Sequence, residues 1–146
     1  MDRKFMKLAL DEAKIAFSKG EVPVGAVIVK NGEVVASSHN LREQKQNALS
    51  HAEMEAINLA CEKLGSWRLD DCELYVTLEP CPMCTGAIIN ARIKTVIFGA
   101  YDSKMGCMDS VINLCDYPFN HKVEVYGGIM EEECLLVLQD FFKNLR

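Results

Sequence analysis

Residues 74–99, with the sequence LYVTLEPCPMCTGAIINARIKTVIFG, contain the unit that decides the fold. Residues 74–78 form a short apolar and β-prone run, which predicts a strand. Pro80 and Pro82 then mark the start of a helix, and residues 95–99 form a second β-prone run. A strand, a helix and a strand in this order predict two parallel strands joined by a right-handed crossover.

The segments on either side extend this unit into a larger sheet. Asn31-Gly32 lies between two β-prone runs and predicts a hairpin, whereas the polar residues 41–50 and residues 101–107 are expected to be loops. Further helices are predicted at residues 3–18, 51–64, about 109–115 and 131–145, and further strands at residues 22–29, 34–36 and 123–126. The pattern therefore predicts an α/β fold, a three-layer α/β/α sandwich with a mixed five-stranded sheet.

Length and composition favour one globular domain over residues 1–146. The 16 Lys and Arg residues are outnumbered by 21 Asp and Glu residues, which gives a formal net charge of −5. This balance argues against broad, nonspecific nucleic-acid binding but allows a local basic site. No apolar run approaches the ~20 residues that span a bilayer, and the N-terminal residues do not resemble a signal peptide. We therefore expect a cytoplasmic protein without a membrane segment.

The cysteine count points to a reducing compartment. There are seven cysteines, an odd number that excludes a fully paired disulfide framework within one chain. Five of them stand alone in mixed or apolar surroundings and are interpreted as small hydrophobic residues: Cys61, Cys72, Cys107, Cys115 and Cys134. The other two, Cys81 and Cys84, form a Cys-x-x-Cys motif at the start of a predicted helix.

This motif and a histidine predict a metal site. Cys81 and Cys84 are three residues apart, so both sulfurs lie on one side of the first helical turn. The positive end of the helix favours thiolates, which are ligands for zinc. His51, at the start of another predicted helix, supplies a nitrogen. Three protein ligands with an open fourth position are typical of a catalytic zinc rather than a structural one.

A catalytic zinc site also needs a group that carries protons. Glu53 lies two residues from His51, and Glu55 lies one helical turn from it. Helical periodicity alone does not choose between these two carboxylates. Glu79, just before the second helix, is interpreted as structural, as a cap for that helix.

Two other sites are compatible with part of this pattern. A thioredoxin-like redox pair would use Cys81 and Cys84 but leave His51 unexplained. A closed structural zinc site would need a fourth ligand. Neither His39 nor His121, nor any lone cysteine, stands at ligand spacing from this group.

The combination of His51-Ala52-Glu53 with Pro80-Cys81-Pro82-Met83-Cys84 resembles the signature of the zinc-dependent cytidine/deoxycytidylate deaminase superfamily. The resemblance covers Met6 to Phe142 and implies a cytidine-deaminase-like fold. Within the superfamily, the chain is similar to the bacterial tRNA-specific adenosine deaminases. The matching segments include residues 21–27, 51–54, 74–84, 98–100, 102–104, 120–121 and 140–142.

The resemblance implies an enzyme, a hydrolase that converts adenosine to inosine at the wobble position of tRNA and releases ammonia. One zinc ion per chain would be held by His51, Cys81 and Cys84, and Glu53 would carry the protons. It also implies a homodimer that binds the anticodon stem-loop. The implied substrate contacts are Asn40 and the backbone N–H of Ala52 with the base, Val24 and Leu78 as pocket walls, and Asp102, Asn120, His121 and Phe142 with the RNA.

Two other functions stay open on the sequence. A small-molecule deaminase of the same fold would act on guanine, cytosine or a free nucleoside, and the acidic net charge suits it. A noncatalytic zinc-binding subunit of an RNA-editing heterodimer is the other alternative. Glu53 argues against that subunit, because a purely structural site has no use for a free carboxylate beside the metal.

Overall fold

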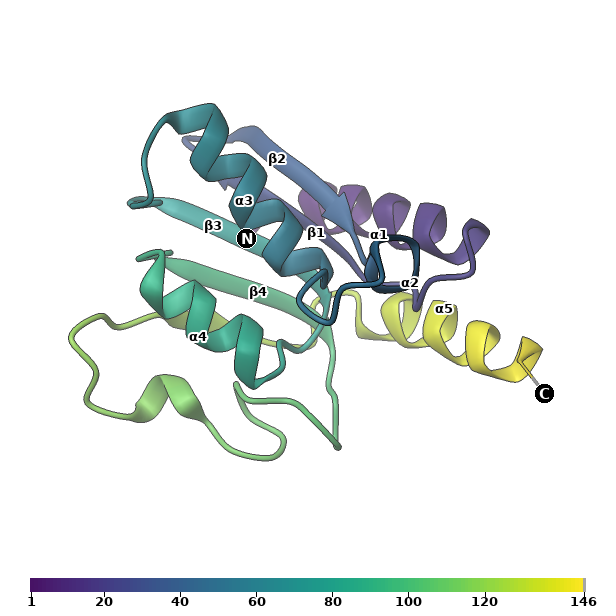
Figure 1. Ribbon diagram of the computed structural model, residues 1–146. Helices are drawn as coiled ribbons and strands as arrows, with labels where there is room; N and C mark the ends of the chain where they lie inside the picture. Colours follow the sequence, from purple (N-terminus) through teal and green to yellow (C-terminus); the bar gives the residue numbers. More distant parts are fainter. Residues whose placement is uncertain (146) are drawn as a thin grey trace.

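One mixed sheet organises the protein, and the computed structural model describes its residues 1–145 (Figure 1). Five strands lie in the order β2-β1-β3-β4-β5. Their bounds are Gly25–Lys30 for β1, Glu33–His39 for β2, Cys72–Leu78 for β3, Thr95–Ala100 for β4 and Glu124–Tyr126 for β5. The β1 strand pairs antiparallel with both β2 and β3, whereas β3, β4 and β5 are parallel. The predicted mixed five-stranded sheet is confirmed.

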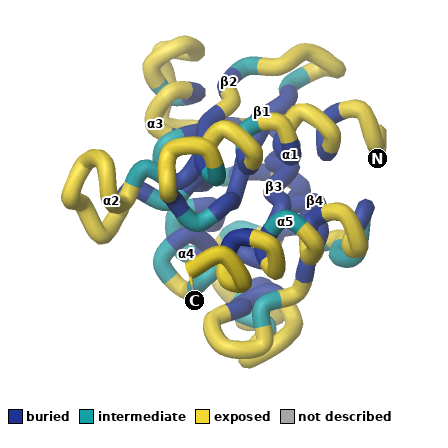
Figure 2. Tube along the Cα trace, turned by 90° about the vertical axis from the view of Figure 1, so that its right-hand side faces the viewer, coloured by how far each residue is buried: buried dark blue, intermediate teal, exposed yellow. Residues whose placement is uncertain are grey.

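Two pairs of helices cover the two faces of this sheet (Figure 1). Helices α1 (Arg3–Ser18) and α5 (Glu131–Asn144) pack against each other and the strands on one face. Helices α3 (Ala52–Leu64) and α4 (Pro82–Asn90) pack together on the other. Figure 2 shows the buried residues concentrated in the strands and on the inner sides of the helices. The predicted three-layer sandwich is therefore confirmed.

The first helix illustrates how sequence pattern becomes packing. Asp2 caps α1 by accepting a hydrogen bond from the backbone N–H of Lys4 at 3.0 Å. Its buried residues recur at helical spacing and face the sheet: Phe5, Met6, Ala9, Leu10, Ala13 and Ala16. Gly25 permits the close approach of α1 to β1, because a Cβ at this position would overlap the backbone of Ala9 and Ala13. The apolar stripe of α1 thus packs against this face of the sheet.

Two local expectations in the N-terminal third of the chain were wrong. The first strand begins at Gly25 rather than at residue 22, since Pro23 has no N–H to donate to the ladder. The expected loop at residues 41–50 contains one helical turn, α2 (Arg42–Lys45). The carboxylate of Glu21 accepts hydrogen bonds from the Glu43 and Gln44 N–H groups at 3.0 and 2.7 Å and so stabilises this turn.

The helix expected at about 109–115 is also absent as such. Only a 3₁₀ turn, η1 (Leu114–Asp116), forms there. The N–H groups of Met108, Asp109 and Ser110 donate instead to a side chain of another segment, Glu79. Because these donors are held in place by a distant residue, the chain is bent where local propensity favoured a helix.

The edge of the sheet where parallel strands end is the place for a functional site. Leu78 at the end of β3 pairs with Ala100 at the end of β4. Helices α3 and α4 both begin near this edge (Figure 1). Ligands bind at this edge in open α/β sheets. Among residues 1–145, no helix is both long and apolar enough to cross a membrane.

Candidate active site

Three potential metal ligands meet where α3 and α4 begin. His51 is the N-cap of α3, Cys81 is the N-cap of α4, and Cys84 lies in the first turn of α4. The Nδ1 atom of His51 lies 3.6 Å from the Cys81 Sγ and 3.5 Å from the Cys84 Sγ. All three ligand atoms lie within 4.8 Å of one another.

These separations fit a tetrahedral metal ion. Zinc–sulfur bonds of about 2.3 Å and zinc–nitrogen bonds of about 2.0–2.1 Å place two tetrahedral ligand atoms about 3.6 Å apart. The donor set of one imidazole and two thiols is also one that zinc prefers. The predicted His-Cys-Cys group is therefore assembled in the fold and could hold a metal ion.

The first turn of α4 favours a thiolate at Cys81. The hydrogen bond with the Cys84 thiol is the main cause that lowers the pKa of Cys81 to about 4, and the contact with His51 adds to it. Burial opposes this shift but does not outweigh it. The backbone N–H groups at the helix start act in the same direction. Cys81 is thus the thiol of this pair that ionises first, whereas the pKa of Cys84 is raised, mainly by its hydrogen bond with Cys81.

A cavity of about 300 Å³ lies beside these ligands. This volume is at the lower end of the range for small-molecule sites. The residues that line it are Val22, Val24, Asn40, Arg42, His51, Ala52, Glu53, Leu78, Glu79, Cys81, Asp102 and Met105. The fold therefore brings the predicted base-contacting and wall residues to one cavity with two of the three predicted ligands, His51 and Cys81. These residues are Asn40, Ala52, Val24 and Leu78. Val22, Arg42 and Met105 had not been predicted as lining residues.

The structure separates the two carboxylates that periodicity left equivalent. Glu53 is only 4% exposed and lines the cavity. Burial is the main cause that raises the pKa of Glu53 to about 7, so this carboxyl group can gain or lose a proton near neutral pH. Glu55 instead forms an ion pair with Lys45 at 2.8 Å and does not line the cavity. The geometry favours Glu53 as the proton carrier.

Two hydrogen bonds hold the side chain of Asn40 in the cavity wall. Its Oδ1 accepts a hydrogen bond from the Arg42 N–H at 3.1 Å, and its Nδ2 donates to the Val22 carbonyl at 3.4 Å. A side-chain amide has two N–H donors, so one is left after the bond to Val22. Asn40 thus stabilises the local turn and lines the cavity with an oriented polar group.

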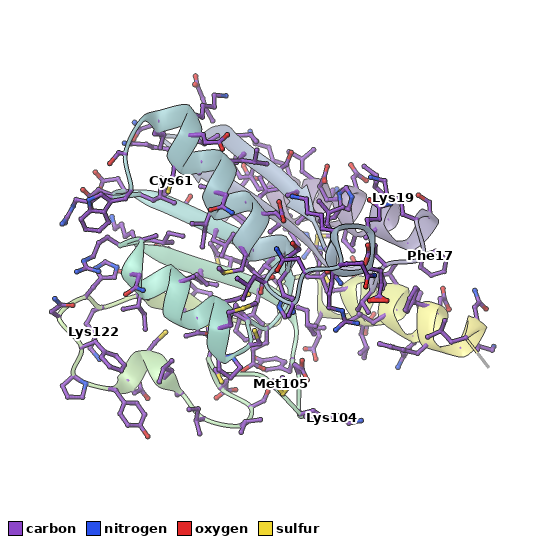
Figure 3. The ribbon with its side chains drawn as sticks, in the orientation of Figure 1. Phe17, Lys19, Cys61, Lys104, Met105 and Lys122 are labelled. Carbon is purple, nitrogen blue, oxygen red and sulfur yellow. The ribbon has the colours of Figure 1, made fainter. Side chains whose placement is uncertain are left out.

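A wider groove of about 870 Å³ continues from the cavity towards α5. The two share Val22, Arg42, Leu78, Asp102 and Met105. Phe142, Lys143 and Lys104 line the groove beyond the shared residues, and Figure 3 shows Lys104 and Met105 in the loop that follows β4. The groove therefore combines positive charge with aromatic surface.

The two adjacent phenylalanines of α5 have different environments. Phe142 is 49% exposed, whereas Phe141 is 8% exposed and packs against Phe17, with ring centroids 5.7 Å apart. Residues next to each other on a helix face different directions. Phe142 is thus the phenylalanine that presents its ring to the groove.

Asn120 and His121 lie away from this cavity. The His121 Nε2–H donates to the carbonyl of Ile93 at 2.7 Å, near the start of β4 rather than its end. The reason is topological, because the segment must return to the beginning of the parallel strand β5. The structure does not bring these two predicted RNA contacts to the cavity or the groove of the same chain.

Comparisons with known proteins agree with this fold and site. A family model for MafB19-like deaminases matches residues 1–146, so the class is that of the deaminases. The tRNA-specific adenosine deaminase of Bacillus subtilis is 53% identical over 146 residues, covering 99% of this chain and 91% of that protein. The one from Aquifex aeolicus is 52% identical over 143 residues, covering 97% and 94%.

A solved structure gives the same result. It comes from studies of A-to-I editing by tRNA:A34 deaminases at the wobble position of transfer RNA. It superimposes with a TM-score of 0.91 at 43% identity, covering 94% of this chain and all of that one. This chain belongs to the family of tRNA-specific adenosine deaminases. The family predicted from the sequence is confirmed.

Proposed function

We propose that this chain is a zinc-dependent enzyme that converts adenosine to inosine at the wobble position of a tRNA anticodon stem-loop. The observation that carries the proposal is the His51, Cys81 and Cys84 group beside the buried Glu53. The high identity to tRNA-specific adenosine deaminases supports the substrate. A tRNA substrate also implies that the enzyme acts in the cytoplasm.

The proposed reaction replaces the amino group at C6 of adenine with oxygen from water and releases ammonia. When bound, zinc makes hydroxide available near neutral pH. Glu53 takes a proton from the attacking water and delivers it to the base. The same carboxyl group then assists the loss of ammonia. Its buried position in the cavity wall allows it to reach both water and base.

The remaining cavity residues hold the flipped base. Val24 and Leu78 supply apolar walls, and burial of the base between them excludes water. The N–H group of Asn40 and the backbone N–H of Ala52, in the first turn of α3, supply hydrogen-bond donors. These contacts orient C6 towards the metal ligands and Glu53.

The groove is proposed to hold the nucleotides next to the target. Arg42, Lys104 and Lys143 contact phosphates, and the exposed ring of Phe142 stacks on a base. Asp102 contacts sugar. A net charge of −5 rules out a uniformly basic surface, so binding must be local and depend on the shape of the loop.

A homodimer would give Asn120 and His121 access to RNA, since they lie away from the groove of their own chain. Helix α4 offers a half-exposed apolar surface at Met83, Gly86 and Ala87. A Cβ at Gly86 would meet no atom within 4 Å, so a second copy of the chain could approach this surface closely. If the protein is a monomer when it binds the stem-loop, Asn120 and His121 have no role in that binding.

The central test is deamination of a stem-loop. We expect the purified protein to convert the wobble adenosine of an arginine-tRNA anticodon stem-loop to inosine, measured by nucleoside analysis of the digested RNA. The matched control is the same stem-loop with guanosine at that position. Turnover of free guanine, cytosine or a nucleoside without turnover of the RNA would overturn the proposed substrate.

The two phenylalanines of α5 give a second test. Phe142→Ala is expected to raise the KM for the stem-loop by about tenfold, because stacking of a base on an aromatic ring contributes about 1–3 kcal/mol. Its thermal stability should change little. Phe141→Ala removes a buried ring and is expected to lower the free energy of unfolding by about 3–5 kcal/mol. An unchanged KM in Phe142→Ala would remove this residue from the RNA site.

A further inference from the structure

The carboxylate of Glu79 ties the end of β3 to a loop more than twenty residues away. Its Oε1 accepts hydrogen bonds from the Asp102 N–H at 3.0 Å and from the Ser110 hydroxyl. Its Oε2 accepts from the N–H groups of Met108, Asp109 and Ser110 at 3.1, 2.8 and 2.9 Å. Glu79 is therefore not the cap of α4 that the sequence suggested, but an anchor for residues 102–110.

Gly106 lets this loop close around the anchor. A Cβ at Gly106 would overlap the carboxyl group of Glu79, so a larger residue cannot occupy this position without moving the loop. The next residue, Cys107, donates its N–H to the carbonyl of Pro80 at 2.9 Å. The base of the loop is therefore fixed to both Glu79 and Pro80, whereas residues 103–105 at its tip are exposed.

The anchor continues into the cavity wall through Asp102. Glu79 holds the N–H of Asp102, and the Oδ1 of Asp102 in turn accepts from the N–H groups of Lys104 and Met105 at 3.0 and 3.2 Å. Asp102 and Met105 line both the cavity and the groove. The position of the mouth between the two therefore depends on a buried carboxylate behind it.

Glu79 lines the cavity but is poorly suited to carry protons. An ionised carboxylate offers about four acceptor positions, and five donors already point at its two oxygens. Its structural role is thus distinct from the role of Glu53.

We infer that Glu79 is a positioning residue for the RNA substrate, which sets the mouth of the active site by fixing Asp102 and Met105 through the loop at residues 102–110. This inference rests on the proposed function. It implies that loss of the anchor weakens productive RNA binding, because the mouth then samples other positions. The chemistry beyond the mouth, at Glu53 and the metal ligands, stays in place.

Glu79→Gln is the informative substitution. An amide group keeps the size of the side chain but turns one acceptor into a donor, which then faces N–H groups. We expect the KM for the stem-loop to rise by about tenfold or more. This is the size of effect that follows when one hydrogen bond to a charged group, here a loop N–H to the Glu79 carboxylate, is lost. The kcat should stay within about threefold of the parent and the zinc content unchanged, because Glu79 is not a ligand. Removal of a negative charge alone would lower the KM for RNA instead.

A second measurement reports on the loop directly. Trypsin cleavage after Lys104 should be faster in Glu79→Gln than in the parent protein, since a released loop fits a protease more readily. Ser110→Ala removes only the hydroxyl donor and should show the same changes at smaller size. Glu73→Gln, at the opposite end of β3, is the matched control and should leave both the KM and the cleavage rate unchanged.

The outcomes separate this inference from the proposed function. An unchanged KM and cleavage rate in Glu79→Gln, or a fall in kcat at unchanged KM, would overturn the positioning role. If Glu79→Gln does not fold, Ser110→Ala decides by the same two measurements. If the parent protein fails to deaminate the stem-loop, the proposed function fails, and the cleavage rates still show whether Glu79 anchors the loop.

Discussion

Glu53→Gln is expected to retain bound zinc and to lower the kcat for stem-loop deamination by about 10²–10⁴-fold, the range that a positioned general acid or base contributes. The substitution keeps the size of a side chain that is 4% exposed. It removes the only function that the proposal gives to this residue, the transfer of protons. Single-turnover rates with saturating enzyme, together with zinc content measured by mass spectrometry, check the prediction.

Glu55→Gln is the matched control for this variant. Glu55 lies two residues further along α3 and pairs with the half-exposed Lys45. Because Glu55 does not line the cavity, Glu55→Gln should keep nearly full activity. Activity within tenfold of the parent in Glu53→Gln, or a large loss in Glu55→Gln, would show that the wrong carboxylate has been assigned.

The metal group was predictable because its signal is local. The spacing of Cys81 and Cys84 and the position of each motif at a helix start can both be derived from the sequence. The fold then needs only to bring two helix starts to one edge of the sheet. The parallel pairing of β3 and β4, predicted from residues 74–99, provides that edge.

The choice between Glu53 and Glu55 was not predictable from periodicity. Both residues lie in the first turn of α3, and helical spacing places both near His51. Burial distinguishes them, and burial depends on the segments that pack over this turn. The ion pair of Glu55 with Lys45 requires the α2 turn, which the sequence did not reveal.

The role of Glu79 and the position of His121 depend on long-range contacts. Glu79 meets donors 23 to 31 residues away, and no local pattern indicates that a loop will fold around one carboxylate. These same contacts prevented the helix expected at about 109–115. His121 was grouped with the RNA contacts by resemblance alone, whereas its position follows from the topology of β5.

Cys84→Ala is expected to lose bound zinc and, with it, deamination. Loss of a partner that only orients a ligand already costs about 10–100-fold in metal affinity, so loss of a ligand should cost at least about 100-fold. Cys84 is buried in the first turn of α4. Without its sulfur, only two protein ligands, His51 and Cys81, are left to bind the zinc ion. Zinc content and inosine formation, measured on the same preparation, should fall together.

Two controls separate loss of metal from loss of fold. Cys61→Ala, in the last turn of α3 and outside the cavity, removes a thiol of the same kind and should keep zinc and activity. The parent protein, stripped of metal with a chelator, should lose activity and regain it when zinc is added, because Glu53 and the cavity remain in place. Cys84→Ala should not be rescued at the same zinc concentration. If Cys84→Ala keeps one zinc per chain, or if the stripped parent stays active, the His51, Cys81 and Cys84 group is not the catalytic metal site.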